Sequence, residues 1–97
     1  MIVEHATLEI EPGREAEFEA AFAAAPAIFA QAEGCHGVEL RRCIEHPGRY
    51  LLFVTWDSVD HHMVTFRESP LFADWRALVG DFFATPPTVE HYQPLDA

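Results

Sequence analysis

Three side chains in the second half of the chain could together carry out acid–base chemistry on an aromatic molecule. They are Trp56, His62 and Arg76. An imidazole is the side chain best suited to proton transfer near neutral pH. The indole could pack against a flat ring, and the guanidinium could stabilise negative charge that develops on that ring. No motif around them fixes one reaction.

His62 is preferred to its neighbour His61 as the acid–base group. Met63 and Phe66 indicate that this helical turn faces inward on the side of His62. Side chains one residue apart do not share a helix face, so His61 is expected to point elsewhere.

Each of the three candidates also has a structural alternative. Trp56 could be a core residue at the end of a strand, since large aromatic rings are usually buried. His62 could be an ordinary surface or hydrogen-bonded histidine. Arg76 could pair with a nearby acid such as Asp74 or Asp81.

The charge balance excludes two classes of partner. The chain has 97 residues, with 16 acidic side chains, six arginines and no lysine, and a formal net charge of −10. Nucleic acids and anionic membrane surfaces require clustered positive charge, so neither is an expected partner. A hydrophobic content of 49% predicts one globular domain over residues 1–97.

The sequence predicts a cytoplasmic protein without a disulfide, a metal or a cofactor. The N-terminus lacks the basic region of a signal peptide, and the longest apolar run, residues 20–30, is too short to span a bilayer. On one strand, Cys35 and Cys43 would lie roughly 26 Å apart at the usual rise per residue. A disulfide needs about 6 Å between its Cα atoms. No Cys/His spacing typical of zinc sites occurs.

The elements that must position the candidate residues follow from hydrophobic periodicity. Residues 2–10 alternate as a strand, and residues 14–31 have helical spacing that Gly34 ends and Pro26 is expected to kink. Strands are predicted at 35–45 and 50–56, the latter apolar on both faces and so expected to be buried on both. Ser69 and Pro70 begin a second helix, and residues 88–92 form a last strand.

This βαββαβ order predicts an α+β, ferredoxin-like fold with an antiparallel sheet. Two helices can cover only one face of that sheet. The other face would carry Val3 and Thr7, and a second copy of the chain is the expected cover. His5 belongs to this second face, and His91 could join it there in a structural role.

Over almost its whole length, the chain resembles the antibiotic-biosynthesis monooxygenase (ABM) domain of the dimeric α/β-barrel superfamily. The resemblance rests on the order and spacing of these motifs: Pro12-Gly13 before a Glu-rich helix, Gly34-Cys35-x-Gly37, Arg49-Tyr50 through Trp56-x-Ser58 with His62, Phe72-x-x-Trp75-Arg76, and Pro87-x-Val89-x-His91-Tyr92. It implies a homodimer whose sheets join into a barrel, with a pocket between the sheet and helices of each monomer. Some members are cofactor-independent oxygenases of phenols and quinols, some degrade haem, and many have no known reaction.

Haem degradation is not expected from this resemblance. The haem-degrading members use an Asn on the first strand, a Trp after the third strand and a His farther along. The corresponding positions here hold Ala6, Val64 or Thr65, and Arg76.

The polyketide-oxidising members match in part. Trp56 and Arg76 stand where they have a Trp and an Arg, but Leu52 replaces an Asn and His62 replaces a Tyr. The resemblance therefore implies a cofactor-independent monooxygenase that uses O₂ on a small phenolic or quinol-like compound. His62 would be its base, Trp56 its wall and Arg76 the group that stabilises negative charge.

The alternative is a non-catalytic ligand-binding or dimerisation module on the same barrel. A cavity touched by Trp56, His62 and Arg76 would favour the enzyme. A filled core with His62 in solvent would favour the module.

Overall fold

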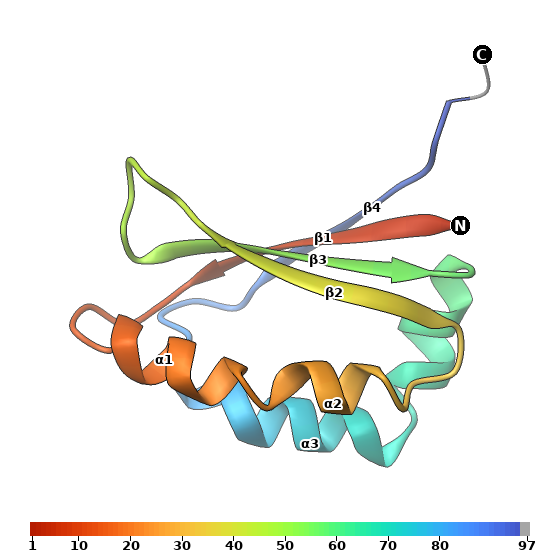
Figure 1. The fold of residues 1–97 in the computed structure, drawn as a ribbon, viewed down its shortest axis with the longest axis horizontal. Helices are drawn as coiled ribbons and strands as arrows, with labels where there is room; N and C mark the ends of the chain where they lie inside the picture. The colour runs from red at the N-terminus through yellow and green to blue at the C-terminus, as the bar shows by residue number, and fades with distance from the viewer. Residues whose placement is uncertain (96–97) are drawn as a thin grey trace.

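Four antiparallel strands form one sheet in the order β2-β3-β1-β4 (Figure 1). The computed structural model describes residues 1–95. The strands are β1 (Ile2–Glu9), β2 (Cys35–Arg42), β3 (Arg49–Trp56) and β4 (Thr88–Tyr92). Their order and direction confirm the ferredoxin-like α+β fold.

The helices lie on one face of this sheet, so the opposite face is left open (Figure 1). Between the strands the chain forms α1 (Glu15–Phe22), α2 (Ala25–Phe29), a π-helical turn η1 (His61–Phe66), α3 (Pro70–Val79) and a 3₁₀ turn η2 (Gly80–Phe82). Ser69 precedes α3 in an extended conformation with Pro70 in the first turn, as the sequence predicted.

The first helical region differs from its prediction, because it is two short helices rather than one kinked helix. Pro26 lies in the first turn of α2. Proline has no N–H to donate to the carbonyl four residues back, so it is tolerated only at the start of a helix. The chain therefore ends α1 at Phe22 and starts again at Ala25.

The predicted burial of β3 on both faces is wrong for the single chain. The strand alternates between one buried and one half-buried face, because helices cover only one side. The buried face carries Tyr50, Leu52, Val54 and Trp56, and the half-buried face carries Leu51, Phe53 and Thr55.

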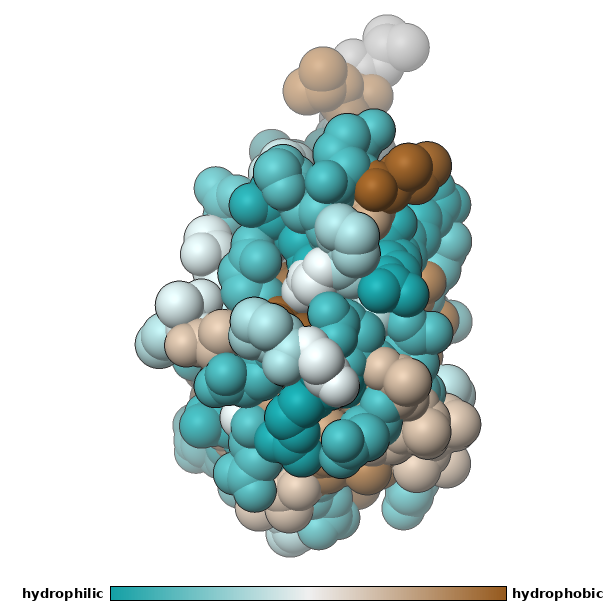
Figure 2. Space-filling model, turned by 90° about the vertical axis from the view of Figure 1, so that its left-hand side faces the viewer, coloured by the Kyte–Doolittle hydropathy of each residue, from teal (hydrophilic) through white to brown (hydrophobic). Residues whose placement is uncertain are grey.

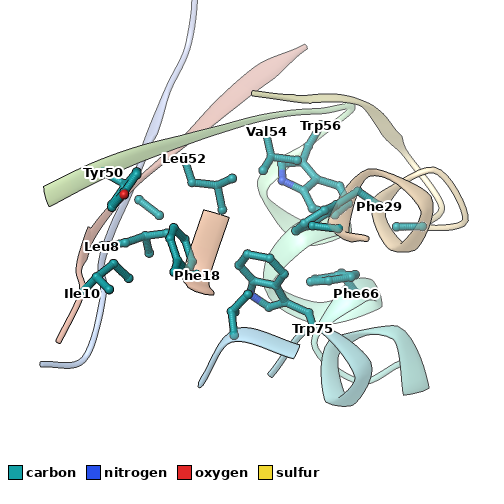
Figure 3. Packing of buried hydrophobic residues seen from close by; sticks show 14 residues of the cluster. Leu8, Ile10, Phe18, Phe29, Tyr50, Leu52, Val54, Trp56, Phe66 and Trp75 are labelled. Atoms are coloured by element: carbon teal, nitrogen blue, oxygen red, sulfur yellow. The ribbon is translucent and has the colours of Figure 1, made fainter. Parts of the chain in front are cut away.

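The core lies between the buried face of the sheet and the helices (Figure 3). Helix α3 contributes Trp75 and Val79 to it, and both are buried. Figure 3 shows the sheet residues Leu8, Leu52, Val54 and Trp56 facing Phe18, Phe29, Phe66 and Trp75 from the helical layer.

The outer surface is mostly polar at the end of the molecule that bears the β2–β3 hairpin (Figure 2). Within residues 1–95, no helix is long and apolar enough to cross a membrane. Cys35 and Cys43 are free thiols.

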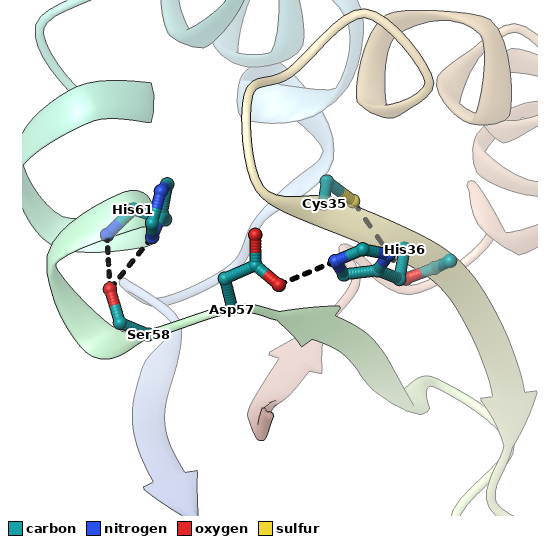
Figure 4. Close-up of polar contacts among 6 residues, drawn as sticks. Cys35, His36, Asp57, Ser58 and His61 are labelled. Atoms are coloured by element: carbon teal, nitrogen blue, oxygen red, sulfur yellow. Dashed lines mark hydrogen bonds and ion pairs between the residues drawn. The ribbon is translucent and has the colours of Figure 1, made fainter.

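A polar corner joins β3 to η1 and sets the direction of the helical turn that carries His62 (Figure 4). Ser58 Oγ accepts a hydrogen bond from the His61 backbone N–H at 3.2 Å and lies 2.7 Å from His61 Nδ1. Asp57 Oδ1 lies 2.6 Å from His36 Nε2 on β2. Ser58 therefore caps the start of this turn.

Gly34 makes the close approach of β2 to this corner possible. Its φ is +80°, a conformation that favours glycine, and a Cβ here would lie 2.5 Å from Cγ of His61. Gly13 has a similar φ of +87°, but a Cβ there would meet nothing within 4 Å.

We expect Gly34→Ala to destabilise the fold more than Gly13→Ala. Both substitutions incur the backbone cost of about 1–2 kcal/mol for a left-handed residue. Only Gly34→Ala adds an overlap with the His61 ring, which should cost about 1–3 kcal/mol more. Urea denaturation of both variants measures the difference, and equal losses would show that contact with His61 does not constrain the corner.

Candidate active site

A cavity of about 250 Å³ lies between the covered face of the sheet and the helices. Its wall comes from three strands, from α2, η1 and α3, and from the segment before β4. The lining residues are Glu4, Ala6, Leu8, Phe29, Leu52, His62, Phe66, Arg67, Phe72, Trp75, Arg76, Phe83, Pro86, Pro87 and Val89. Most of this lining is apolar or aromatic, which is typical of a site for a small organic molecule.

The structure brings two of the three predicted site residues to this cavity. His62 lines it and is only 4% exposed, and Arg76 lines it while its side chain reaches solvent. Trp56 does not line it. The indole is fully buried and stacks on the His62 ring, with 5.3 Å between ring centroids and 18° between planes.

Sequence reasoning missed the most unusual residue of the site, Glu4, which is 5% exposed. Nε1–H of Trp56 donates a hydrogen bond to Glu4 Oε1 at 3.0 Å. Nε2 of His62 lies 3.3 Å from the same oxygen. A signal was available, since Glu4 is the one charged residue on the otherwise apolar face of the 2–10 alternation.

His91 also belongs to this site, and its predicted place beside His5 is wrong. His91 Nε2 lies 2.8 Å from His62 Nδ1. The antiparallel register of β1 and β4 pairs His91 with Glu4, whereas His5 pairs with Glu90. Directly paired residues share a sheet face, so His91 lies on the covered face.

Glu4, His62 and His91 form a line of contacts rather than a convergent set. His62 uses one ring nitrogen toward Glu4 and the other toward His91. Among the residues that the structure describes, no three His, Cys, Asp or Glu side chains are grouped to hold a metal ion. His62 thereby links the Glu4 carboxyl in the cavity wall to His91 on the edge strand β4.

Burial moves the pKa values of the two central groups in opposite directions. Desolvation raises the pKa of Glu4 to about 7, although the Trp56 hydrogen bond and the charge of Arg67 oppose the rise. Desolvation, helped by His91 and Arg67, lowers the pKa of His62 to about 4. Burial disfavours the charged form of each group, so between these values the Glu4–His62 pair holds one proton and carries no net charge.

The positive charge of the site comes from Arg67 and Arg76. Both line the cavity. Their guanidinium carbons lie 5.8 Å and 5.9 Å from the centroid of the same ring, Phe72. Neither forms an ion pair within residues 1–95, so the alternative pairing of Arg76 with Asp74 or Asp81 is not observed. Arg67 was not identified from the sequence.

The two variants Glu4→Gln and His62→Gln should change the pH dependence of stability in opposite ways. Between pH 4.5 and 6.5, the ordinary pKa values of Glu and His, the unfolded pair holds one proton on the histidine, and the folded pair also holds one. The pair therefore contributes almost no pH dependence there in the wild type.

Without Glu4, only His62 titrates, and its depressed pKa makes stability fall as pH is lowered from 6.5 toward 4. Without His62, only Glu4 titrates, and its raised pKa makes stability fall as pH is raised from 4.5 toward 7. Each slope should approach about 1.4 kcal/mol per pH unit relative to wild type. Urea denaturation of each variant at several pH values across this range measures both slopes. Slopes identical to wild type in both variants would show that the pair does not share a proton.

Comparison with known proteins places the fold in a family. The sequence profile described as "Antibiotic biosynthesis monooxygenase" (ABM) matches residues 1–78. The Bacillus subtilis (strain 168) protein YczJ, which is uncharacterised, is 40% identical over 95 residues, covering 98% of this chain and 100% of that protein.

Solved structures of similar proteins support the same family. A Bordetella bronchiseptica protein named "Putative antibiotic biosynthesis monooxygenase" is 54% identical, with a TM-score of 0.94 over 97% of this chain and 96% of that one. SnoaB of Streptomyces nogalater, a cofactor-independent oxygenase, shares the fold at 19% identity, with a TM-score of 0.77 over 99% of this chain and 94% of its own. The chain therefore belongs to the antibiotic biosynthesis monooxygenase family.

Proposed function

We propose that the protein is a cofactor-independent monooxygenase that oxidises a small phenolic or quinol-like compound with O₂. The observation that carries this proposal is the Glu4–His62 pair, a buried acid–base group in the wall of a largely aromatic cavity. Membership of the ABM family supports it, because SnoaB, a protein of the same fold, is a cofactor-independent oxygenase.

The chemistry needs a base, an aromatic wall and stabilisation of negative charge. The deprotonated pair takes a proton from the substrate, and the resulting anion transfers one electron to O₂. Recombination of the two radicals forms a C–O bond at a ring carbon that bears hydrogen. The pair returns its proton to the outer oxygen of the peroxide. Loss of the hydrogen on that ring carbon as a proton then breaks the O–O bond. One oxygen atom stays as a carbonyl, and the other leaves as hydroxide, which takes up this second proton and becomes water.

The pKa of the pair suits this first step. A phenol has a pKa of about 10, so its transfer of a proton to a group with a pKa of about 7 costs roughly 4 kcal/mol. The positive charges of Arg67 and Arg76 in the cavity wall lower this cost, because they attract a developing phenolate through space without direct contact. The active form is the pair without a proton, which predominates above about pH 7.

Trp56 takes a different role in this proposal from the wall that the sequence suggested. Its N–H holds Glu4 Oε1 and its ring supports the His62 imidazole. It is a positioning residue for the pair. The aromatic wall is instead supplied by the cavity residues Phe29, Phe66, Phe72 and Trp75.

A non-catalytic ligand-binding module is the rival function. Such a module would also have a cavity, but it would not need a titrating pair in the cavity wall. Burial of His62 at 4% exposure, rather than a solvent position, favours the enzyme. The free thiols of Cys35 and Cys43 suit a reducing compartment, and we propose a cytoplasmic location.

Oxygen consumption with a panel of anthrones and quinols tests the proposal. We expect wild-type activity to rise with pH through a midpoint of about 7, where Glu4 ionises. Glu4→Gln and His62→Ala should each lower kcat by roughly 100-fold or more, the usual contribution of a general base. Trp56→Phe should move the midpoint above 7, because the Trp56 hydrogen bond lowers the pKa of Glu4.

His46→Ala is the matched control, because His46 is an exposed histidine in the β2–β3 hairpin and should leave turnover unchanged. The rival module would be supported by no turnover across the panel, or by unchanged turnover in both Glu4→Gln and His62→Ala.

The proposal includes a homodimer formed through the open face of the sheet. Half-buried apolar side chains lie there, among them Leu51 and Phe53. The His5 ring lies 5.2 Å from that of Phe53, and its Nδ1 is buried without a hydrogen-bond partner among the described residues. A second copy could cover the apolar groups and supply that partner.

Light scattering at micromolar concentration should therefore give a dimer mass. Phe53→Asp places a charge on the open face and should shift the mass toward the monomer. His46→Ala, outside that face, should remain dimeric. A wild-type monomer would contradict this part of the proposal.

A further inference from the structure

The arginines of this chain divide into two groups. Among the described residues, four of the six form an ion pair with a carboxylate within 4 Å, namely Arg14, Arg41, Arg42 and Arg49. The other two, Arg67 and Arg76, form none. In a chain with 16 acidic side chains, two unpaired cations at one place are unexpected.

Both unpaired arginines line the cavity, and both lie against Phe72. Their guanidinium carbons are 5.8 Å and 5.9 Å from the centroid of that ring. Stacking on an aromatic ring holds a guanidinium in place while its N–H groups remain free to donate. The cavity wall beside Phe72 therefore carries two cationic groups with N–H donors available to a ligand.

Below about pH 7, where the Glu4 carboxyl holds its proton, no ionised acid in the cavity lining cancels this charge. Glu4 is the only acidic residue in the lining, and it already contacts Trp56 and His62. A neutral substrate would leave both arginines without a partner. An anionic substituent would accept hydrogen bonds from them, and charge-assisted bonds of this kind are stronger than neutral ones.

The size of the cavity limits the rest of the ligand. Its volume is about 250 Å³. An apolar protein cavity of about 150 Å³ is enough to bind benzene. The space here therefore encloses one substituted ring, and a ligand with several fused rings would extend out of it.

We propose that the substrate is a monocyclic phenol or quinol that carries a carboxylate, which Arg67 and Arg76 bind at the Phe72 end of the cavity. The phenolic group then faces the Glu4–His62 pair. This inference rests on the proposed function for the identity of the ring. The anion site itself is tested by binding alone.

Isothermal titration calorimetry with two matched probes tests the anion site. The probes are 2,5-dihydroxybenzoate and the neutral 2,5-dihydroxybenzamide, which have the same ring and nearly the same shape. At pH 6, where the Glu4–His62 pair carries no net charge, we expect the carboxylate to bind about tenfold or more tightly than the amide, from one or two charged hydrogen bonds. The preference should shrink as salt is added.

Two variants and a control assign the preference to the cavity arginines. Arg67→Gln and Arg76→Gln should each remove most of the difference between the two probes. Arg14→Gln makes the same change of charge at a guanidinium that also lies over a ring, Phe82 at 4.4 Å, but outside the cavity lining. It should keep the full preference. Far-ultraviolet circular dichroism checks that all three variants fold.

Equal binding of the two probes, no binding of the carboxylate at millimolar concentration, or a preference that survives in both cavity variants would overturn the anion site. Oxygen uptake with neutral quinols distinguishes this failure from failure of the proposed function. Selective carboxylate binding without oxygen uptake by any probe would keep the anion site and overturn the oxygenase.

Discussion

The candidate site is arranged around a carboxyl group, that of Glu4, buried on the covered face of the first strand. An isolated carboxylate cannot be buried without a large loss of solvation. Glu4 avoids that loss by sharing one proton with His62 and by accepting a hydrogen bond from Trp56. One carboxylate oxygen thereby links Glu4 to Trp56, which is 52 residues farther along the chain, and to His62. The β1–β3 register places Ile2 opposite Trp56 and Glu4 opposite Val54. Residues two apart on a strand share a face, so Glu4 and Trp56 are diagonal neighbours on the covered face.

The same linkage explains why the aromatic residue at the end of β3 is not part of the cavity wall. The indole of Trp56 donates its N–H to Glu4 and stacks on the ring of His62, so it does not face the cavity. The flat surfaces that face the cavity come instead from the helical layer. Positive charge in the cavity wall comes from Arg67 and Arg76, which both lie against Phe72, and the charge of Arg67 also acts on Glu4 and His62. The cavity therefore combines an acid–base pair, two cations and aromatic walls. The ABM fold alone does not determine such an arrangement, since the side chains of the site and not the fold decide the chemistry.

Sequence patterns were sufficient for the architecture because alternation, helical spacing and turn residues are local. They placed the strands, the start of the second helix at Ser69 and Pro70, and the open sheet face. They also identified His62 and Arg76, which do reach the cavity. The break before Pro26 was missed because hydrophobic periodicity continues through it, whereas backbone hydrogen bonding does not. His91 was assigned to the wrong face because its face depends on the β1–β4 register, which no local pattern encodes. Glu4 was visible as a charge within an apolar alternation, but its meaning required its partners from β3 and η1.

NMR titration of the wild-type protein shows directly whether the Glu4–His62 pair holds a single proton between about pH 4 and pH 7. The side-chain carboxyl ¹³C of Glu4 and the ring ¹⁵N nuclei of His62 report the two protonation states separately. We expect Glu4 to titrate near pH 7 and His62 to stay neutral down to about pH 4. Titration of Glu4 near 4.5 and of His62 near 6.5, their ordinary values, would contradict it.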